Sequence, residues 1–134
     1  MYLEKLSMKD RLAVVTGAGN GIGFSCAEAL AESGATVFIA DIDEEAARTA
    51  ANRLSKSGYK ADWDQLDVTN SSAVSSCVRK IVDRYGMVDV LVNNAGIGKT
   101  FEPAEDMTDE VWHAVLDVNL NGLFWCCRAF GKEY

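Results

Sequence analysis

The chain has 134 residues, of which 49% are hydrophobic and 25% charged, proportions typical of one soluble globular domain. Its net charge of −7 argues against a nucleic-acid partner, because proteins that bind nucleic acids usually present a basic face. No apolar run approaches the ~20 residues of a membrane span, and the first ten residues lack the apolar centre of a signal peptide. We therefore expect one cytoplasmic domain, residues 1–134, with neither nucleic acid nor membrane as a partner.

Apolar runs predict four strands, and each run is followed by a helical pattern. The runs are continuous rather than alternating, as in strands covered on both faces, although the third is more polar than the others. The predicted strands cover residues 11–17, 35–41, 59–68 and 88–96, and the predicted helices residues 22–33, 43–58, 71–85 and 110–130. Strand ends about every 25 residues indicate stacked βα units, and right-handed crossovers then require a parallel sheet with helices on both faces.

Capping residues and apolar spacing indicate where the predicted helices begin and end and which face is buried. Gly34 stands where the first helix needs a left-handed residue after its end, and Thr108 is the expected N-cap of the last helix. Spacing predicts an inner face of the first helix made of Ile22, Cys26, Ala29, Leu30 and Ser33.

The cysteines and the single histidine indicate no metal site. Cys26, Cys77, Cys126 and Cys127 show no C-x-x-C spacing, so we expect small buried or half-buried thiols rather than ligands or disulfides. His113 lies in a mixed polar and apolar stretch and is expected on a helix surface.

Four glycines lie in residues 16–23 (TGAGNGIG), directly after the first predicted strand. A helix that begins there offers free N–H groups to an anion, and glycine lets a pyrophosphate approach bare backbone. The spacing is G-x-x-x-G-x-G, through Gly17, Gly21 and Gly23, rather than the commoner G-x-G-x-x-G. The loop therefore predicts a phosphate site, and a purely structural turn is the alternative.

An acid follows at the end of the second predicted strand. Asp41 comes 20 residues after Gly21, where a carboxylate can accept hydrogen bonds from a ribose 2′-OH. Neither Asn20 nor Ile42 is basic, so nothing there would offset the repulsion of a 2′-phosphate, and NAD(H) is favoured over NADP(H). A helix cap is the alternative role for Asp41.

Two further segments lie at the carboxyl ends of later strands, where open α/β sheets bind ligands. They are Asp67-Val68 and residues 93–96 (NNAG), whose small and amide side chains can border an adenine and a ribose. Turn formation is the alternative for both.

Together with Asn119 in DVNLNG, these motifs resemble the short-chain dehydrogenase/reductase family, in that family's order and approximate spacing, from about Lys9 to the end. The resemblance implies a Rossmann-type, doubly wound parallel sheet of about four strands in the order 3-2-1-4. It also implies hydride transfer between NAD and a small-molecule alcohol or ketone. The residues expected to contact the cofactor are Gly17, Asn20, Gly21, Ile22, Gly23, Asp41, Asp67, Val68, Asn93, Ala95 and Gly96.

The same resemblance makes Asn119 the one catalytic residue present, ordering a water in a proton relay. From the residues alone, Asn119 could instead bond to backbone at a helix kink. The family also needs a serine and Tyr-x-x-x-Lys, in which lysine lowers the pKa of tyrosine, but no tyrosine here is followed by lysine four residues later. The chain thus resembles the first half of the catalytic domain, and we expect it to be inactive alone.

Two consequences are expected from an incomplete fold. The fourth strand becomes an apolar edge, and the last helix exposes Leu123, Phe124, Trp125 and Cys127. We therefore expect association, as a homo-oligomer or with a complementary chain, through that strand and helix.

The alternative function is a non-catalytic NAD(H)-binding or regulatory module. A methyltransferase would usually carry an acid just before its glycines, where Val15-Thr16 stands here.

Overall fold

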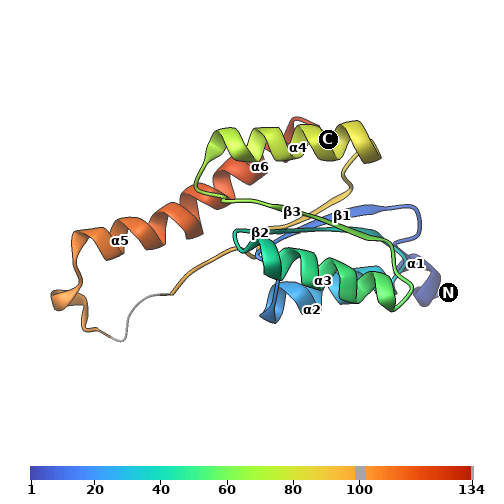
Figure 1. Cartoon of the computed structure of the whole chain (residues 1–134), viewed down its shortest axis with the longest axis horizontal. Coiled ribbons are helices and arrows are strands. Elements are labelled where there is room, and N and C mark those ends of the chain that lie inside the picture. The colour runs from blue at the N-terminus through green and yellow to red at the C-terminus, as the bar shows by residue number, and fades with distance from the viewer. Residues whose placement is uncertain (99–101, 134) are drawn as a thin grey trace.

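Four short parallel strands form the central sheet in the order β3-β2-β1-β4. Figure 1 labels three of them, β1, β2 and β3. The computed structural model describes residues 1–98 and 102–133. The strands are β1 (Leu12–Thr16), β2 (Thr36–Asp41), β3 (Ala61–Gln65) and β4 (Val90–Val92). Val14 of β1 stands opposite Phe38 on one side and Leu91 on the other. The predicted parallel sheet and its strand order are confirmed.

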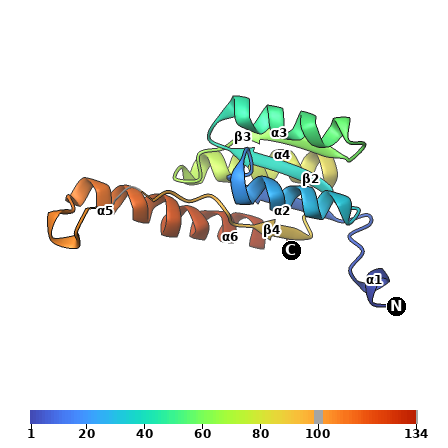
Figure 2. The ribbon, with the colours of Figure 1, turned by 90° about the horizontal axis from the view of Figure 1, so that it is seen from below.

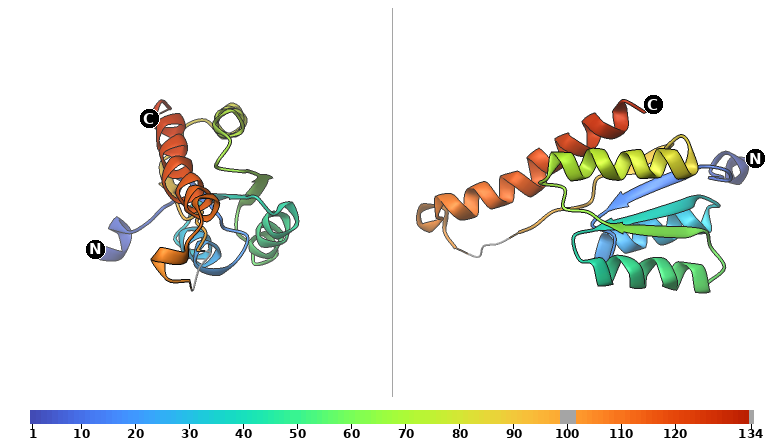
Figure 3. Two further views of the ribbon diagram at one scale, coloured as in Figure 1. Left: turned by 90° about the vertical axis from the view of Figure 1, so that its left-hand side faces the viewer. Right: turned by 45° about the horizontal axis from the view of Figure 1, so that its top comes forward.

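Helices cover both faces of this sheet (Figures 2 and 3). One layer holds α2 (Gly21–Glu32) and α3 (Glu44–Lys56), and the other holds α4 (Ser71–Tyr85) and α6 (Leu123–Gly131). A short helix α1 (Tyr2–Lys5) lies at the N-terminus and away from both layers (Figure 2). A 3₁₀ turn η1 (Ala104–Asp106) precedes α5 (Asp109–Leu116), and a π-helical turn η2 (Asp117–Gly122) joins α5 to α6.

Strand residues alternate between two apolar cores. Val15 and Ile39 pack with α2 and α3, whereas Val14 and Phe38 pack with α4 and α6. All five residues of β1 are buried. Because β1, β2 and β4 contribute to both cores, their sequences are continuously apolar rather than alternating, which is why the pattern predicted a doubly covered sheet.

The predicted inner face of α2 is correct for Cys26 and Leu30, which are half-buried against the core, and wrong for the other three residues, which are exposed. The buried residues are Gly23, Phe24, Ala27 and Ala31, whereas Ile22 is 78% exposed at the start of the helix. Glycine and alanine at these positions allow α2 to lie close to the sheet, and this small-residue face carries little hydrophobic signal in the sequence. The predicted caps are confirmed: Thr108 accepts a hydrogen bond from the N–H of Val111, and Gly34 has a φ of 104°.

The polar residues of β3 face α4. Asp62 forms an ion pair with Arg84 at 2.8 Å, and Asp64 forms one with Lys80 at 2.9 Å. The hydroxyl of Tyr85 donates to Asp62 at 2.5 Å, and burial together with this bond raises the pKa of Tyr85 to about 12. These contacts explain why an edge strand carries two carboxylates. The strand ends at Gln65, three residues before the predicted end.

The long C-terminal helical segment extends beyond the sheet (Figure 3). Trp112, Leu120, Leu123 and Phe124 are exposed along it, each by more than 40%, and Cys127 is exposed as well. At the edge of the sheet, all three residues of β4 are half-buried. Within the part of the chain that is described, no helix is both long and apolar enough to cross a membrane.

Candidate functional site

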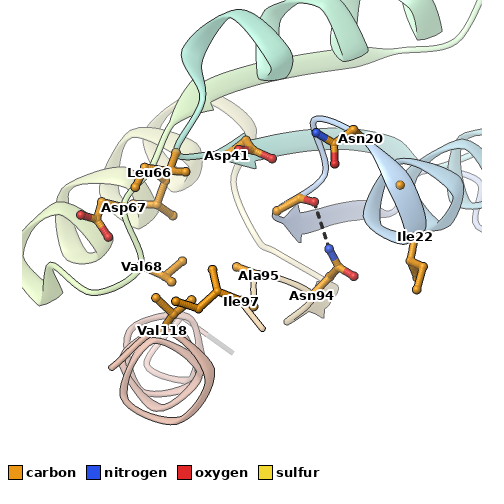
Figure 4. Close-up of a pocket in the computed structure, with 14 residues that line it drawn as sticks. Asn20, Ile22, Asp41, Leu66, Asp67, Val68, Asn94, Ala95, Ile97 and Val118 are labelled. Atoms are coloured by element: carbon orange, nitrogen blue, oxygen red, sulfur yellow. Dashed lines mark hydrogen bonds between the residues drawn. The ribbon is translucent and has the colours of Figure 1, made fainter. Parts of the chain in front are cut away.

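A pocket of about 390 Å³ opens at the carboxyl ends of the strands (Figure 4). The loop after β1, the end of β2, the loop after β3, the segment after β4 and η2 each contribute to its wall. Nine of the predicted cofactor residues line it: Gly17, Asn20, Gly21, Ile22, Asp41, Asp67, Val68, Ala95 and Gly96. The residues that lie far apart in the sequence therefore meet at one site, as expected for an open parallel sheet.

Three glycines of the β1–α2 loop are required by its geometry. Gly17 and Gly21 have φ angles of 63° and 58°, which favour glycine. A Cβ on Gly17 would lie 2.8 Å from the Cα of Ala95, and one on Gly23 would lie 2.5 Å from the carbonyl oxygen of Gly17. Gly23 is buried beneath the loop and does not line the pocket, so its role is to permit this packing.

The start of α2 faces the pocket with its backbone. Asn20 is the N-cap residue, but its side chain makes no capping hydrogen bond. The first-turn N–H groups of Gly21, Ile22 and Gly23 are therefore left without a side-chain cap at the positive end of the helix dipole. Together with the absence of side chains at Gly17 and Gly21, this suits a phosphate group.

Asp41 has a fixed carboxylate at the pocket wall. Its Oδ2 accepts from the N–H of Gly19 at 2.9 Å, and its Oδ1 accepts from the N–H of Asp43 at 3.0 Å. A Cβ on Gly19 would lie 2.9 Å from Oδ2, so a larger residue there would disturb the arrangement. The helix cap, the alternative role expected for Asp41, is instead Asp43, whose side chain accepts from the N–H of Ala46 at 3.0 Å. Each oxygen of Asp41 keeps lone-pair capacity for a ligand.

A buried hydroxyl joins the glycine loop to the segment after β4. Thr16 is 1% exposed, and its Oγ1 accepts from the N–H groups of Asn94 at 3.2 Å and Ala95 at 3.1 Å. The Asn94 side chain donates to the carbonyl oxygen of Gly17 at 3.0 Å, as drawn in Figure 4. Asn94, rather than Asn93, is the asparagine that lines the pocket.

Asn93 and Asn119 lie outside the pocket lining. The Nδ2 of Asn93 donates to the Sγ of Cys127 at 3.2 Å, which ties the end of β4 to α6. Asn119, in η2, accepts from the N–H of Ile97 and donates to its carbonyl oxygen, both at 2.8 Å. Asn119 thus bonds to backbone from the π-helical turn η2, and a backbone contact at a helix kink was the alternative role that its sequence context allowed.

The loop after β3 gives an apolar wall. Leu66 and Val68 are 4% and 6% exposed, and both line the pocket. The carboxylate of Asp67 accepts from the N–H and hydroxyl of Thr69 at 3.0 and 2.7 Å, which holds the turn. Five further lining residues were not among those expected to contact the cofactor: Ile42, Leu66, Asn94, Ile97 and Val118. All five adjoin a residue of the predicted motifs, and this adjacency was the available signal.

The structure places the cysteines apart from the pocket. Burial raises the pKa of Cys77 to about 12 and that of Cys126 to about 11, so both thiols stay protonated at neutral pH. Cys26 is half-buried on α2, and His113 is exposed on α5. In residues 1–98 and 102–133, no three His, Cys, Asp or Glu side chains come close enough together to hold a metal ion.

Comparisons with known proteins agree with this geometry. The family model described as short chain dehydrogenase matches residues 11–134. A galactitol 2-dehydrogenase of Rhizobium johnstonii is 43% identical over 132 residues, which are 98% of this chain and 51% of that protein. The crystal structure of gox2181 superposes with a TM-score of 0.97 at 45% identity, covering 99% of this chain and 52% of that one.

A second solved structure holds a cofactor. The gluconate 5-dehydrogenase from Burkholderia cenocepacia, in complex with NADP and tartrate, superposes with a TM-score of 0.92 at 37% identity. The alignment covers 98% of this chain and 51% of that protein. The chain thus spans about half the length of the relatives that it matches.

Proposed function

Because the chain belongs to the short-chain dehydrogenase family, we propose that it is the NAD(H)-binding half of an NAD-dependent oxidoreductase that acts on a small alcohol or ketone. The pyrophosphate would lie against Gly17, Gly21 and the first-turn N–H groups of α2, beside Asn20 and Ile22. Ala95 and Gly96 would border the cofactor on the β4 side. When bound, NAD⁺ supplies the acceptor for a hydride from the alcohol carbon.

The preference for NAD(H) rests on Asp41. Its two oxygens are held by the N–H groups of Gly19 and Asp43, so the carboxylate presents its remaining lone pairs to the pocket. Ribose hydroxyls can donate to these lone pairs, whereas a 2′-phosphate would meet a like charge. The gluconate 5-dehydrogenase is in complex with NADP, so the preference of this chain between NADH and NADPH is measured directly in the next experiment.

The Asp41→Ala variant should lose about tenfold or more in affinity for NADH, because it loses hydrogen bonds to a charged acceptor. Its affinity for NADPH should change less or improve, since the repelling charge is gone. NADH and NADPH titrations followed by cofactor fluorescence measure both. Glu44→Gln removes a nearby exposed charge and should leave both affinities unchanged. Wild-type chain that prefers NADPH would contradict the proposal.

Asn119 is the one residue of this chain to which the family resemblance gives a catalytic role. Asn119 holds Ile97 through two backbone contacts and, by family resemblance, would order a water for proton relay. No Tyr-x-x-x-Lys stands in this sequence to receive that relay. We therefore expect the chain alone to bind NAD(H) weakly and to turn over no alcohol. We propose association through the β4 edge and α6, with copies of itself or a complementary chain. β4 is a half-buried apolar edge strand, and α6 exposes Leu123 and Phe124.

A non-catalytic NAD(H)-binding or regulatory module is the second candidate, and the pocket at the strand ends suits it equally. One NADH titration and one steady-state assay with NAD⁺ and alcohols separate the possibilities. Tight saturable binding without turnover would favour the module, and weak binding without turnover the incomplete oxidoreductase. A steady-state rate that Asn119→Ala abolishes would overturn the expected inactivity.

A further inference from the structure

The π-helical turn η2 brings its last residue, Gly122, against Val68 of the loop after β3. A Cβ on Gly122 would lie 2.6 Å from the Cγ2 of Val68 and 3.1 Å from its Cβ. The carbonyl oxygen of Val68 lies 3.3 Å from the same point, so a rotation of the valine side chain alone would not free the space. Both residues are buried. Only glycine fits here without moving the loop or the helix.

Both sides of this contact belong to the pocket wall. Val68 lines the pocket from the β3 loop, and Val118 lines it from η2, one turn before Gly122. Figure 4 shows Val68, Ile97 and Val118 grouped on one side of the pocket, away from Asn20 and Ile22. We call Leu66, Val68, Ile97 and Val118 the base end of the pocket. The spacing between Gly122 and Val68 therefore sets the distance between its two walls.

The position of the base end relative to Asp41 indicates what it would hold. A dinucleotide with its pyrophosphate at the glycine loop and a ribose at Asp41 must place the attached base beyond Asp41. Leu66 and Val68 follow β3, the strand next to β2, and offer apolar side chains there. A flat aromatic base buries its faces well between such side chains.

We propose that Gly122 is a positioning residue that sets the width of the base end and so the affinity for the adenine half of the cofactor. Gly122 touches no ligand itself and acts through Val68. The inference rests on the proposed function, because it takes the pocket to hold NAD(H).

The test measures the affinity for ADP-ribose, which carries the adenine half without nicotinamide, by calorimetry on five chains: wild type, three single variants and one double variant. Gly122→Ala should raise the dissociation constant about tenfold, since it forces Val68 or η2 to move. The same substitution in a Val68→Ala background should raise it much less, because the closest clashing atom, Cγ2 at 2.6 Å, is gone and only the contacts at 3.1 and 3.3 Å remain. Gly131→Ala is the matched control: it lies in α6, nothing lies within 4 Å of its added Cβ, and its affinity should equal wild type.

Circular dichroism separates unfolding from lost binding. If Gly122→Ala unfolds, a double variant that folds and binds like Val68→Ala alone still supports the contact. Equal affinity of wild type and Gly122→Ala, or the same loss in both backgrounds, would overturn the role of Gly122 only. Wild-type chain that does not bind ADP-ribose would overturn the proposed function, and this inference with it.

Discussion

The Gly23→Ala variant should lose NAD(H) binding and much of its folding stability. The added methyl group would lie 2.5 Å from the carbonyl oxygen of Gly17 and 3.0 Å from the Cα of Ala18, so backbone must move. Overpacking of this kind costs about 1–3 kcal/mol or more, and the atoms displaced form the phosphate loop itself. Urea denaturation measures the first effect and NADH titration the second.

A substitution on the exposed side of the same helix provides the control. Ser25 is exposed two residues later, and Ser25→Ala should leave stability and NADH affinity close to wild type. If Gly23→Ala bound NADH as well as Ser25→Ala does, the tight packing of α2 beneath the loop would not matter for the cofactor.

The Thr16→Val variant should be the second most damaging substitution. Valine keeps the shape of threonine but removes the acceptor of the Asn94 and Ala95 N–H groups. The N–H of Asn94 also donates to the carbonyl oxygen of Val92 at 3.1 Å, so only the N–H of Ala95 loses its acceptor. An unsatisfied buried donor costs about 1–3 kcal/mol, and this is the expected loss of unfolding free energy. The segment of Asn94, Ala95 and Gly96 should then lie less firmly against the glycine loop, and the affinity for NADH should fall.

Thr16→Ser keeps the hydroxyl and separates hydrogen bonding from packing. Its loss of unfolding free energy should be well under half that of Thr16→Val, and its NADH affinity should stay near wild type. Equal effects of the two variants on NADH affinity would show that the hydroxyl does not organise the pocket.

The sheet could be predicted from the sequence because its strands are buried on both faces. Continuous apolar runs such as residues 12–15 leave no other arrangement for a chain of stacked βα units. The glycine loop and Asp41 were predictable for a related reason: backbone that must adopt positive φ, or lie close to other backbone, requires glycine at set positions such as Gly17.

The rest depended on contacts that no local pattern reveals. The inner face of α2 consists of glycine, alanine and one phenylalanine, so hydrophobic spacing pointed instead to Ile22, which is exposed. The π-helical turn η2 and its contact between Gly122 and Val68 join segments more than 50 residues apart. Which of two adjacent asparagines faces the pocket was decided by the turn after β4, which directs Asn94 to Gly17 and Asn93 to Cys127.

The most direct test of NAD(H) binding is an amide NMR titration of the isotope-labelled chain with NADH and, separately, with NADPH. Saturable shifts are expected for the N–H groups of Gly19, Gly21, Ile22 and Asp43, which surround the loop and the Asp41 carboxylate. These shifts should saturate at lower concentrations of NADH than of NADPH. Shifts confined to other surfaces, or none at all as NADH is added, would contradict a dinucleotide site in this pocket.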